Sequence, residues 1–247
     1  RAGFKVAICE QTETPEEAKA RGGYKALVNR DVVRVVTQGT LTEDNLLDQN
    51  TNNYLACLAR VADGMGLAWV DMSTGEFWLQ PVSLKTLPAA LERIQAKELV
   101  ISDKLQQDTS MFECFTPFKD ILTVQPHARF DAANAQDRLE DLFGVKTLES
   151  FGGFHRAEIA AAGSLVDYID LTQKGKMPRL SPPRQLSVNG VMDIDSATRR
   201  SLELTHTQQG SRKGSLIATL DRTVTGAGAR LLSKRINMPL TNIDEIN

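Results

Sequence analysis

Apolar side chains along the first 40 residues follow the pattern of two strands. Phe4, Val6 and Ile8 alternate with smaller or polar residues, the period of two that is typical of a half-buried strand. Residues 31–37 are rich enough in β-branched side chains for a second strand. These elements are too few for a core of their own. We therefore expect residues 1–40 to be the end of an α/β domain.

A short helix is predicted between these strands. Thr14 suits an N-cap, Pro15 suits the first helical position and Glu17 completes a capping box. Gly22-Gly23 is expected to end the helix. The chain opens at Arg1 without an initiator Met, so we expect a fragment of a longer protein.

A change of pattern follows a polar stretch rich in Asn and Asp. This stretch, residues 41–53, predicts a linker with one helical turn around Leu46-Leu47. Beyond it, short apolar runs are separated by turn residues, and such close spacing indicates an antiparallel meander. The predicted strands are Tyr54–Val61, Leu67–Asp71 and Glu76–Gln80.

Apolar steps of three and four then predict amphipathic helices. One stripe runs from Leu84 to Ile94 and leads into a buried strand at Glu98–Ser102, and Phe112–Phe115 is expected to add another strand. Two more helices are predicted around Ala132–Leu142, ended by Gly144, and around Ile159–Ile169. Residues 54–175 therefore predict a three-layer α/β unit in the style of the ribonuclease-H fold.

Proline marks the next boundary. Residues 176–190 include three prolines in a basic run, which predicts a linker. Residues 191–247 read as helical, with segments at Asp195–Thr205, Ser215–Leu220 and Thr225–Asn237, the first and last of them capped by Asp195 and Thr225. We expect this to be the start of a helical domain that is cut short. The overall fold class is α/β plus α.

Charge is distributed unevenly along the 247 residues, although the net charge is only −2. Residues 41–175 carry 20 acidic and 11 basic side chains, whereas residues 176–247 carry six and 11. Because nucleic-acid affinity depends on Lys and Arg, the acidic middle is not expected to grip DNA. No apolar stretch is long enough to span a bilayer, and no secretory leader is visible, so we expect a cytoplasmic protein.

Catalytic chemistry is weakly signalled. Asp71, at the end of a predicted central strand, superficially fits the first carboxylate of a metal-dependent ribonuclease-H-like nuclease, but it also fits a strand end bonded to the turn at residues 73–75. No second and third carboxylate stand at convincing positions. The turn is favoured, and the nuclease centred on Asp71 remains the alternative function.

Other sites are also weakly supported. The three histidines and three cysteines lie apart from one another, so no metal site or disulfide framework is predicted. Residues 210–215 are glycine-rich and basic but have the order Lys-Gly-Ser between two helices, not the Gly-Lys-Ser order of a phosphate-binding loop after a strand. No cofactor is therefore expected in this chain.

Basic residues on the last helices are the remaining candidates. Arg230 and Lys234 are four residues apart and share a helix face. Such a face could meet a DNA backbone or pair with acids of another domain, and both interpretations stay open. The candidate basic face comprises Arg199, Arg200, Arg230 and Lys234.

Three separated stretches resemble the MutS family of bacterial DNA mismatch-recognition proteins. Residues 6–11 (VAICEQ) with 32–40 (VVRVVTQGT) are similar to the end of the family's mismatch-binding domain. Residues 71–77 (DMSTGEF) resemble its connector domain, and 197–204 (ATRRSLEL) with 223–240 resemble the start of its helical core, or lever, domain. Gln38 stands where the family usually has Pro, Ser201 where it has Asn, and Arg235 where an aromatic is common.

The resemblance implies a role in DNA mismatch repair. The family's full-length protein is an ATPase that uses ATP and Mg, binds mismatched duplex DNA, forms a homodimer and recruits MutL. Its connector has a ribonuclease-H-like fold without nuclease activity and couples mismatch binding to the ATP-driven change. The Phe-x-Glu motif that wedges into a mismatch is absent from this sequence, so this piece is not expected to be the mismatch reader. It has neither the phosphate-binding loop of the family's ATPase domain nor a catalytic cluster, so it is expected to be non-catalytic.

A partner surface is expected on the helix at residues 131–142. Its polar side carries Gln136, Asp137 and Arg138, which is the surface we expect to face MutL, although simple solvent exposure explains the same pattern. A third reading, a stand-alone DNA-binding module using the basic helices, predicts an affinity that falls steeply with salt.

Overall fold

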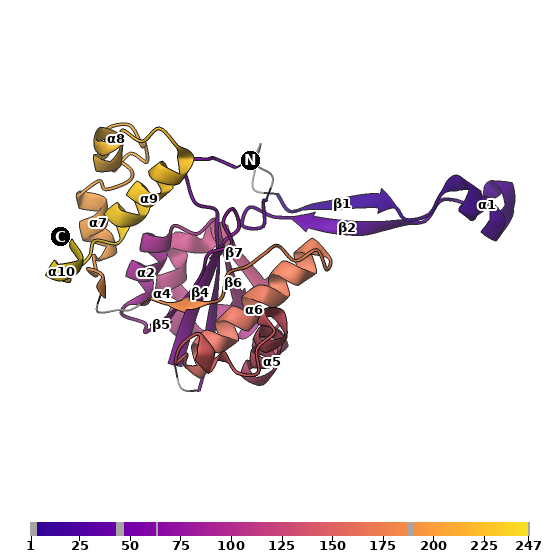
Figure 1. The fold of residues 1–247 in the computed structure, drawn as a ribbon, viewed down its shortest axis with the longest axis horizontal. Helices are drawn as coiled ribbons and strands as arrows, with labels where there is room; N and C mark the ends of the chain where they lie inside the picture. Colours follow the sequence, from indigo (N-terminus) through magenta and orange to yellow (C-terminus); the bar gives the residue numbers. More distant parts are fainter. Residues whose placement is uncertain (1–3, 43–46, 63, 187–189, 247) are drawn as a thin grey trace.

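The first strands form a two-stranded hairpin that projects from the body of the molecule (Figure 1). The computed structural model describes residues 4–42, 47–62, 64–186 and 190–246. Strands β1 (Val6–Gln11) and β2 (Arg30–Val36) pair antiparallel, and helix α1 (Pro15–Gly22) lies at the tip between them. We call residues 4–42 the hairpin segment.

The predicted helix start within the hairpin segment is confirmed, but the predicted burial of its first strand is wrong. Thr14 and Glu17 form the capping box, with the Thr14 backbone N–H donating to Glu17 Oε2 at 2.7 Å. Strand β1 is exposed along its whole length. Most of the hairpin stands away from the sheet, and β2, whose later residues are half-buried, contacts helix α6 (Arg156–Gln173).

The centre of the molecule is a six-stranded mixed sheet with the order β7-β6-β3-β4-β5-β8. The predicted meander is confirmed, because β3 pairs antiparallel with β4, which pairs antiparallel with β5. On its other side β3 is parallel to β6, which is parallel to β7. The strands are β3 (Tyr54–Val61), β4 (Gly64–Asp71), β5 (Phe77–Val82), β6 (Glu98–Ser102), β7 (Leu122–Gln125) and β8 (Arg184–Gln185).

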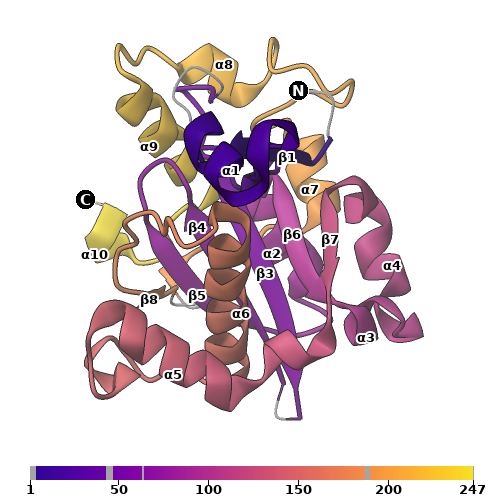
Figure 2. The ribbon, with the colours of Figure 1, turned by 90° about the vertical axis from the view of Figure 1, so that its right-hand side faces the viewer.

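Helices cover both faces of this sheet, because apolar residues fill both sides of the central strands (Figures 1 and 2). Within β3, Leu55 and Cys57 belong to one core, and Ala56 and Leu58 to the other. The first core packs under α5 (Ala132–Phe143) and α6 (Arg156–Gln173), whereas the second packs under α2 (Leu87–Ile94), α3 (Asp103–Gln106) and α4 (Phe112–Phe115). We call residues 53–186 the sheet unit.

Three details of the sheet unit differ from the prediction. Residues 112–115 form helix α4, not a strand, since Phe115 is buried while Phe112, on another face of the turn, is 74% exposed. Strand β7 was missed because it is only four residues long. Strand β8 lies inside the proline-rich segment, where it pairs parallel with β5. The turn expected around Leu46-Leu47 falls partly outside the described residues.

The C-terminal helices, residues 190–246, pack against one end of the sheet unit (Figure 1). They are α7 (Ser196–Ser201), α8 (Leu216–Leu220), α9 (Gly226–Asn237) and α10 (Ile243–Ile246). The predicted caps are confirmed, because Asp195 accepts from the Thr198 N–H and Thr225 from the Gly228 N–H. Helix α7 ends earlier than predicted. Within the described ranges, no helix combines the length and apolarity needed to cross a bilayer.

Candidate functional site

A buried carboxylate joins the hairpin segment to the sheet unit. Glu98, the first residue of β6, is 4% exposed, and its two oxygens accept hydrogen bonds from both parts of the molecule. Oε2 accepts from the Thr37 hydroxyl and from the Gly39 N–H at 3.1 Å. Oε1 accepts from the Thr123 hydroxyl at 2.6 Å and the Tyr168 hydroxyl at 2.7 Å. We call these five residues the Glu98 junction.

Neutral donors hold this carboxylate. A buried charge is tolerated when hydrogen bonds replace its lost hydration, and four donors meet that requirement here. Lys5 forms a longer ion pair, since its Nζ lies 4.0 Å from Oε1 and donates to Thr123 Oγ1 at 3.1 Å. Burial, followed by the negative charge of Glu98, raises the pKa of Tyr168, so this phenol stays protonated and remains a donor.

Close backbone contact reinforces the Glu98 junction. A Cβ on Gly39 would lie 2.6 Å from Glu98 Cβ and 2.6 Å from Leu55 Cδ1, so only glycine fits there. The amide of Asn53 donates to the carbonyls of Gly39 and Leu41, and the Gln173 amide donates to the Thr40 carbonyl at 3.2 Å. The turn after β2 is therefore bonded to three separate parts of the sheet unit.

A second junction, on a different side of the sheet unit, is charged and more exposed. Lys234 of α9 lies 3.1 Å from Glu76 Oε2 and 4.6 Å from the centre of the Trp78 ring. Arg230, one turn earlier, donates to the carbonyl of Gln49 at 2.6 Å. The Glu76 side chain is 45% exposed. We call these five residues the Lys234 junction.

The other two residues of the candidate basic face lie apart. Arg199 is 6% exposed and donates to the side-chain oxygen of Asn237 at 2.9 Å and to its carbonyl at 3.2 Å, which ties α7 to the end of α9. Burial lowers the pKa of this guanidinium from its usual value. Arg200 is exposed. Arg199, Arg230 and Lys234 thus donate to acceptors within the chain.

The expected partner surface on α5 is split by the structure. Gln136 and Asp137 are exposed, and Gln136 donates to Glu140 on the same helix at 2.8 Å. Arg138 turns back toward α6, where it donates to the Gly163 carbonyl at 3.1 Å and lies 3.0 Å from Asp167. Of the three residues, Gln136 and Asp137 present their side chains to solvent.

Asp71 ends β4 and caps its turn. Its carboxylate is fully buried and accepts from the Ser73 N–H at 2.9 Å, the Ser73 hydroxyl at 2.6 Å and the Asn52 amide. The turn interpretation is therefore confirmed. Among the described residues, no group of three His, Cys, Asp or Glu side chains is arranged to hold a metal ion. The alternative of a nuclease centred on Asp71 is not favoured.

The glycine-rich segment at residues 210–215 does not form a phosphate-binding loop. Ser215 caps the short helix α8 by accepting from the Ala218 N–H, and its own hydroxyl donates to the Arg212 carbonyl at 2.6 Å. Gly210 and Gly214 have φ values of +81° and +97°. The segment is a tight connection between helices, not a strand-to-helix phosphate cradle.

The Glu98 junction was missed by the sequence reasoning. The sequence placed Glu98 at the start of a buried strand and assigned it no function. The available signal was the placement of one acidic residue at the head of an otherwise apolar strand, since such a carboxylate needs several donors. Those donors come from residues 37, 39, 123 and 168, and sequence spacing alone does not bring these together.

The chain matches family models along almost its whole length. The model of MutS domain I matches residues 1–45, that of MutS domain II matches 53–181, and that of MutS domain III matches 197–247. The DNA mismatch repair protein MutS of Roseobacter denitrificans is 49% identical over 246 residues, and that of Ruegeria pomeroyi is 49% identical over 251.

Each of these alignments covers 100% of this chain and 28% of the relative. The chain therefore spans about a quarter of the length of the proteins it matches. The MutS protein of Rhizobium meliloti is 45% identical over 250 residues. The domain II model covers more than half of the chain, and the three matches keep the family's order. The chain belongs to the MutS family of DNA mismatch repair proteins and represents part of the N-terminal half of such a protein.

Proposed function

We propose that this chain is a non-catalytic coupling segment of a mismatch-repair ATPase. The observation that carries the proposal is that the sheet unit is bonded on two sides to the neighbouring parts of the chain. The Glu98 junction holds the hairpin segment, and the Lys234 junction holds the C-terminal helices. Both junctions lie at the same end of the sheet, since Glu98 pairs with Leu55, Leu55 with Val70, and Val70 with Phe77. A unit bonded to both neighbours is suited to pass a movement of one neighbour to the other.

The sheet unit is proposed to be a ribonuclease-H-type connector that lacks nuclease function. Its meander β3-β4-β5 is continued beyond β3 by the parallel strands β6 and β7, with helices on both faces. That arrangement supports the fold type. The side chain at the nuclease position, Asp71, is occupied by the Ser73 turn.

In the longer protein, we propose that mismatched duplex DNA, ATP with Mg, a second MutS subunit and MutL are the ligands and partners, in the cytoplasm. ATP and Mg are assigned to parts of the protein other than this chain, since residues 210–215 do not form a phosphate cradle. The coupling segment itself requires no cofactor.

The coupling is tested in the full-length protein by reversing one contact of the Lys234 junction. Lys234→Glu places two acids against each other and is expected to reduce the stimulation of ATP turnover by mismatched DNA several-fold. The double variant Glu76→Lys/Lys234→Glu restores opposite charges and is expected to restore the stimulation. Arg235→Glu, an exposed change on the same helix, is the matched control.

The affinity for mismatched DNA serves as the second readout, because loss of coupling leaves it largely intact. If Lys234→Glu leaves mismatch stimulation equal to that of Arg235→Glu, the coupling role of this junction is rejected. A stimulation that falls in both single variants and is not restored in the double variant also rejects it.

The MutL surface is tested by a pull-down of this chain with MutL. Asp137→Arg reverses an exposed charge on α5 and is expected to weaken capture. The matched control is Glu113→Arg, an exposed charge reversal on α4, on the opposite face of the sheet. Equal capture by the parent and Asp137→Arg removes α5 as the docking surface.

A further inference from the structure

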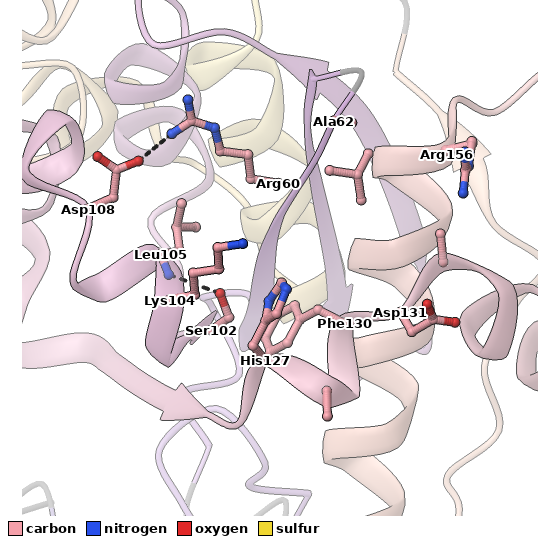
Figure 3. Close-up of a pocket in the computed structure, with 13 residues that line it drawn as sticks. Arg60, Ala62, Ser102, Lys104, Leu105, Asp108, His127, Phe130, Asp131 and Arg156 are labelled. Atoms are coloured by element: carbon pink, nitrogen blue, oxygen red, sulfur yellow. Dashed lines mark hydrogen bonds and ion pairs between the residues drawn. The ribbon is translucent and has the colours of Figure 1, made fainter.

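A cavity of about 710 Å³ opens at the end of the sheet opposite to the end that carries the Glu98 junction. Arg60 and Val61 end β3, Ser102 is the last residue of β6, and His127 follows the end of β7 by two residues (Figure 3). Ligands of open α/β sheets bind outside the carboxyl ends of parallel strands, which is where this cavity lies. Its volume is within the range of small-molecule sites.

Basic side chains gather around the cavity within an acidic part of the chain. Arg60, Lys104, His127 and Arg156 line it, whereas residues 41–175 as a whole carry 20 acidic and 11 basic side chains. Three of those 11 Lys and Arg side chains, Arg60, Lys104 and Arg156, thus line this one cavity. Such a local reversal of charge favours an anionic ligand over the background repulsion.

Both carboxylates in the lining are already occupied by protein donors. Asp108 accepts from the N–H and hydroxyl of Ser110, at 2.9 and 2.7 Å, and its other oxygen pairs with Arg60. These hydrogen bonds, more than the charge of Arg60, hold the pKa of Asp108 below its usual value. Asp131 caps α5 by accepting from the N–H groups of Ala133 and Asn134.

The remaining cations are available to a ligand. Lys104 and Arg156 are exposed, and neither has an ion-pair partner within the part of the chain that the structure describes. Figure 3 shows Lys104 and His127 between the Arg60–Asp108 pair on one side and Arg156 on the other. Asp108 fixes the guanidinium of Arg60 beside them.

Part of the cavity floor is apolar. Ala62 and Ala128 are exposed and Val61 and Ala132 are half-buried, whereas the lining residues Leu105 and Phe130, each 4% exposed, add little surface. Apolar surface beside a basic mouth fits a ligand that has both a charged group and a flat apolar body. A bare inorganic anion would use the basic mouth and leave the floor uncovered.

We propose that this cavity binds a small phosphorylated ligand with a planar apolar body, of the class of the mononucleotides. The phosphate contacts Lys104, Arg156 and Arg60, whose N–H donors match its oxygens, and the body covers Ala128 and Ala132. The site is separate from the two junctions and does not depend on the coupling function.

Titration calorimetry of the 247-residue chain in about 50 mM NaCl tests the proposal with three probes: 5′-AMP, adenosine and inorganic phosphate. We expect saturable binding of 5′-AMP with a Kd of about 0.1–1 mM. Phosphate is expected to bind at least about tenfold more weakly, and adenosine not to saturate. Phosphate binding as tightly as 5′-AMP, or no saturable binding of 5′-AMP up to 10 mM (about ten times the weakest expected Kd), overturns the proposal.

Two variants localise the site. Lys104→Glu/Arg156→Glu is expected to weaken 5′-AMP binding at least about tenfold, since both phosphate contacts become repulsive. Lys85→Glu/Lys176→Glu makes the same change of charge at two exposed lysines that do not line this cavity, and should leave the Kd within about twofold. Equal weakening in both double variants would show a general charge effect and overturn the proposal.

The charge-neutral variant Ala128→Trp fills the cavity mouth without altering a basic residue. It is expected to weaken 5′-AMP binding at least about fivefold while the melting temperature stays unchanged. Unaltered 5′-AMP affinity in this variant places the ligand elsewhere and overturns the proposal. Thermal melting of each variant confirms that the chain is folded.

Discussion

The two junctions of the sheet unit are built from different interactions. At the Glu98 junction one buried carboxylate accepts from four neutral donors, and the side chains of Glu98 and Leu55 leave no room for a Cβ at residue 39. At the Lys234 junction a lysine pairs with a carboxylate that is 45% exposed, and an arginine donates to a backbone carbonyl. The carboxylate of the first junction is buried, whereas that of the second is partly exposed to solvent.

This difference predicts which neighbour moves more readily. Displacing the hairpin segment from Glu98 would strand buried donors and an acceptor, each at a cost of about 1–3 kcal/mol. Displacing α9 from Glu76 exposes groups that water can hydrate, at a cost of about 0.2–1 kcal/mol. We therefore expect the hairpin segment to be the fixed neighbour and the C-terminal helices to be the adjustable one.

Removal of the Glu98 carboxylate should have the largest effect on the stability of the chain. Glu98→Ala leaves the hydroxyls of Thr123 and Tyr168 and the Gly39 N–H without their acceptor, and we expect a loss of about 3 kcal/mol or more in the free energy of unfolding. Urea denaturation measures it. Glu149→Ala, an exposed acid on the same unit, should change stability by less than about 0.5 kcal/mol. A comparable small change for Glu98→Ala would contradict the buried network.

A single methyl group at the turn should have the next largest effect. Gly39→Ala introduces a Cβ 2.6 Å from Glu98 Cβ and Leu55 Cδ1, so the turn must shift, and we expect a loss of about 1–3 kcal/mol. Gly153→Ala is the matched control, because nothing lies within 4 Å of its added Cβ. Equal midpoints of urea denaturation for the two variants would show that the turn has room.

The Glu98 junction also shows how much of the structure could be predicted from the sequence alone. Much of the secondary structure was predictable, because turn residues separate the short apolar runs between residues 54 and 80, and Thr14, Gly144 and Thr225 carry local cap signals. The residues of the Glu98 junction were not, since Thr37, Thr123 and Tyr168 are ordinary in their own segments and meet only after β6 is placed beside β7. Residues 112–115 were misread because four residues are too few to separate helical from strand periodicity.

Breaking the charged contact should have a smaller, salt-dependent effect. Lys234→Ala is expected to destabilise the chain by about 0.5–1 kcal/mol at low salt, and less at 1 M NaCl, where the Debye length is about 3 Å. A double-mutant cycle with Glu76→Ala isolates the coupling energy of the pair. The effect of Glu98→Ala should be nearly independent of salt. If salt changes the destabilisation by Lys234→Ala and by Glu98→Ala equally, the proposed difference between the two junctions is contradicted.

The smallest effect concerns pH, and it again belongs to the C-terminal side. His206 lies near the Lys234 junction, beside a cavity that Lys97 also lines. Burial, then the positive charges of Lys97 and Arg212, lower the pKa of His206 from its usual value near 6.5. The unfolded chain therefore takes up this proton at a higher pH than the folded chain does. Stability should fall as the pH drops through about 6.5 and level off below the lowered pKa.

Because the His206 ring remains exposed, the loss should not exceed about 1 kcal/mol. The difference between the pH profiles of the parent chain and His206→Gln, measured by urea denaturation between pH 8 and pH 5, isolates this contribution from those of the other titrating groups. The part of the loss that comes from Lys97 and Arg212 should shrink at 0.5 M NaCl, since salt screens exposed charges. Superimposable pH profiles for the two chains would show that His206 and its neighbouring cations do not change the stability of the C-terminal side. The exposure of the Glu76–Lys234 pair would then be the remaining difference between the Lys234 junction and the Glu98 junction.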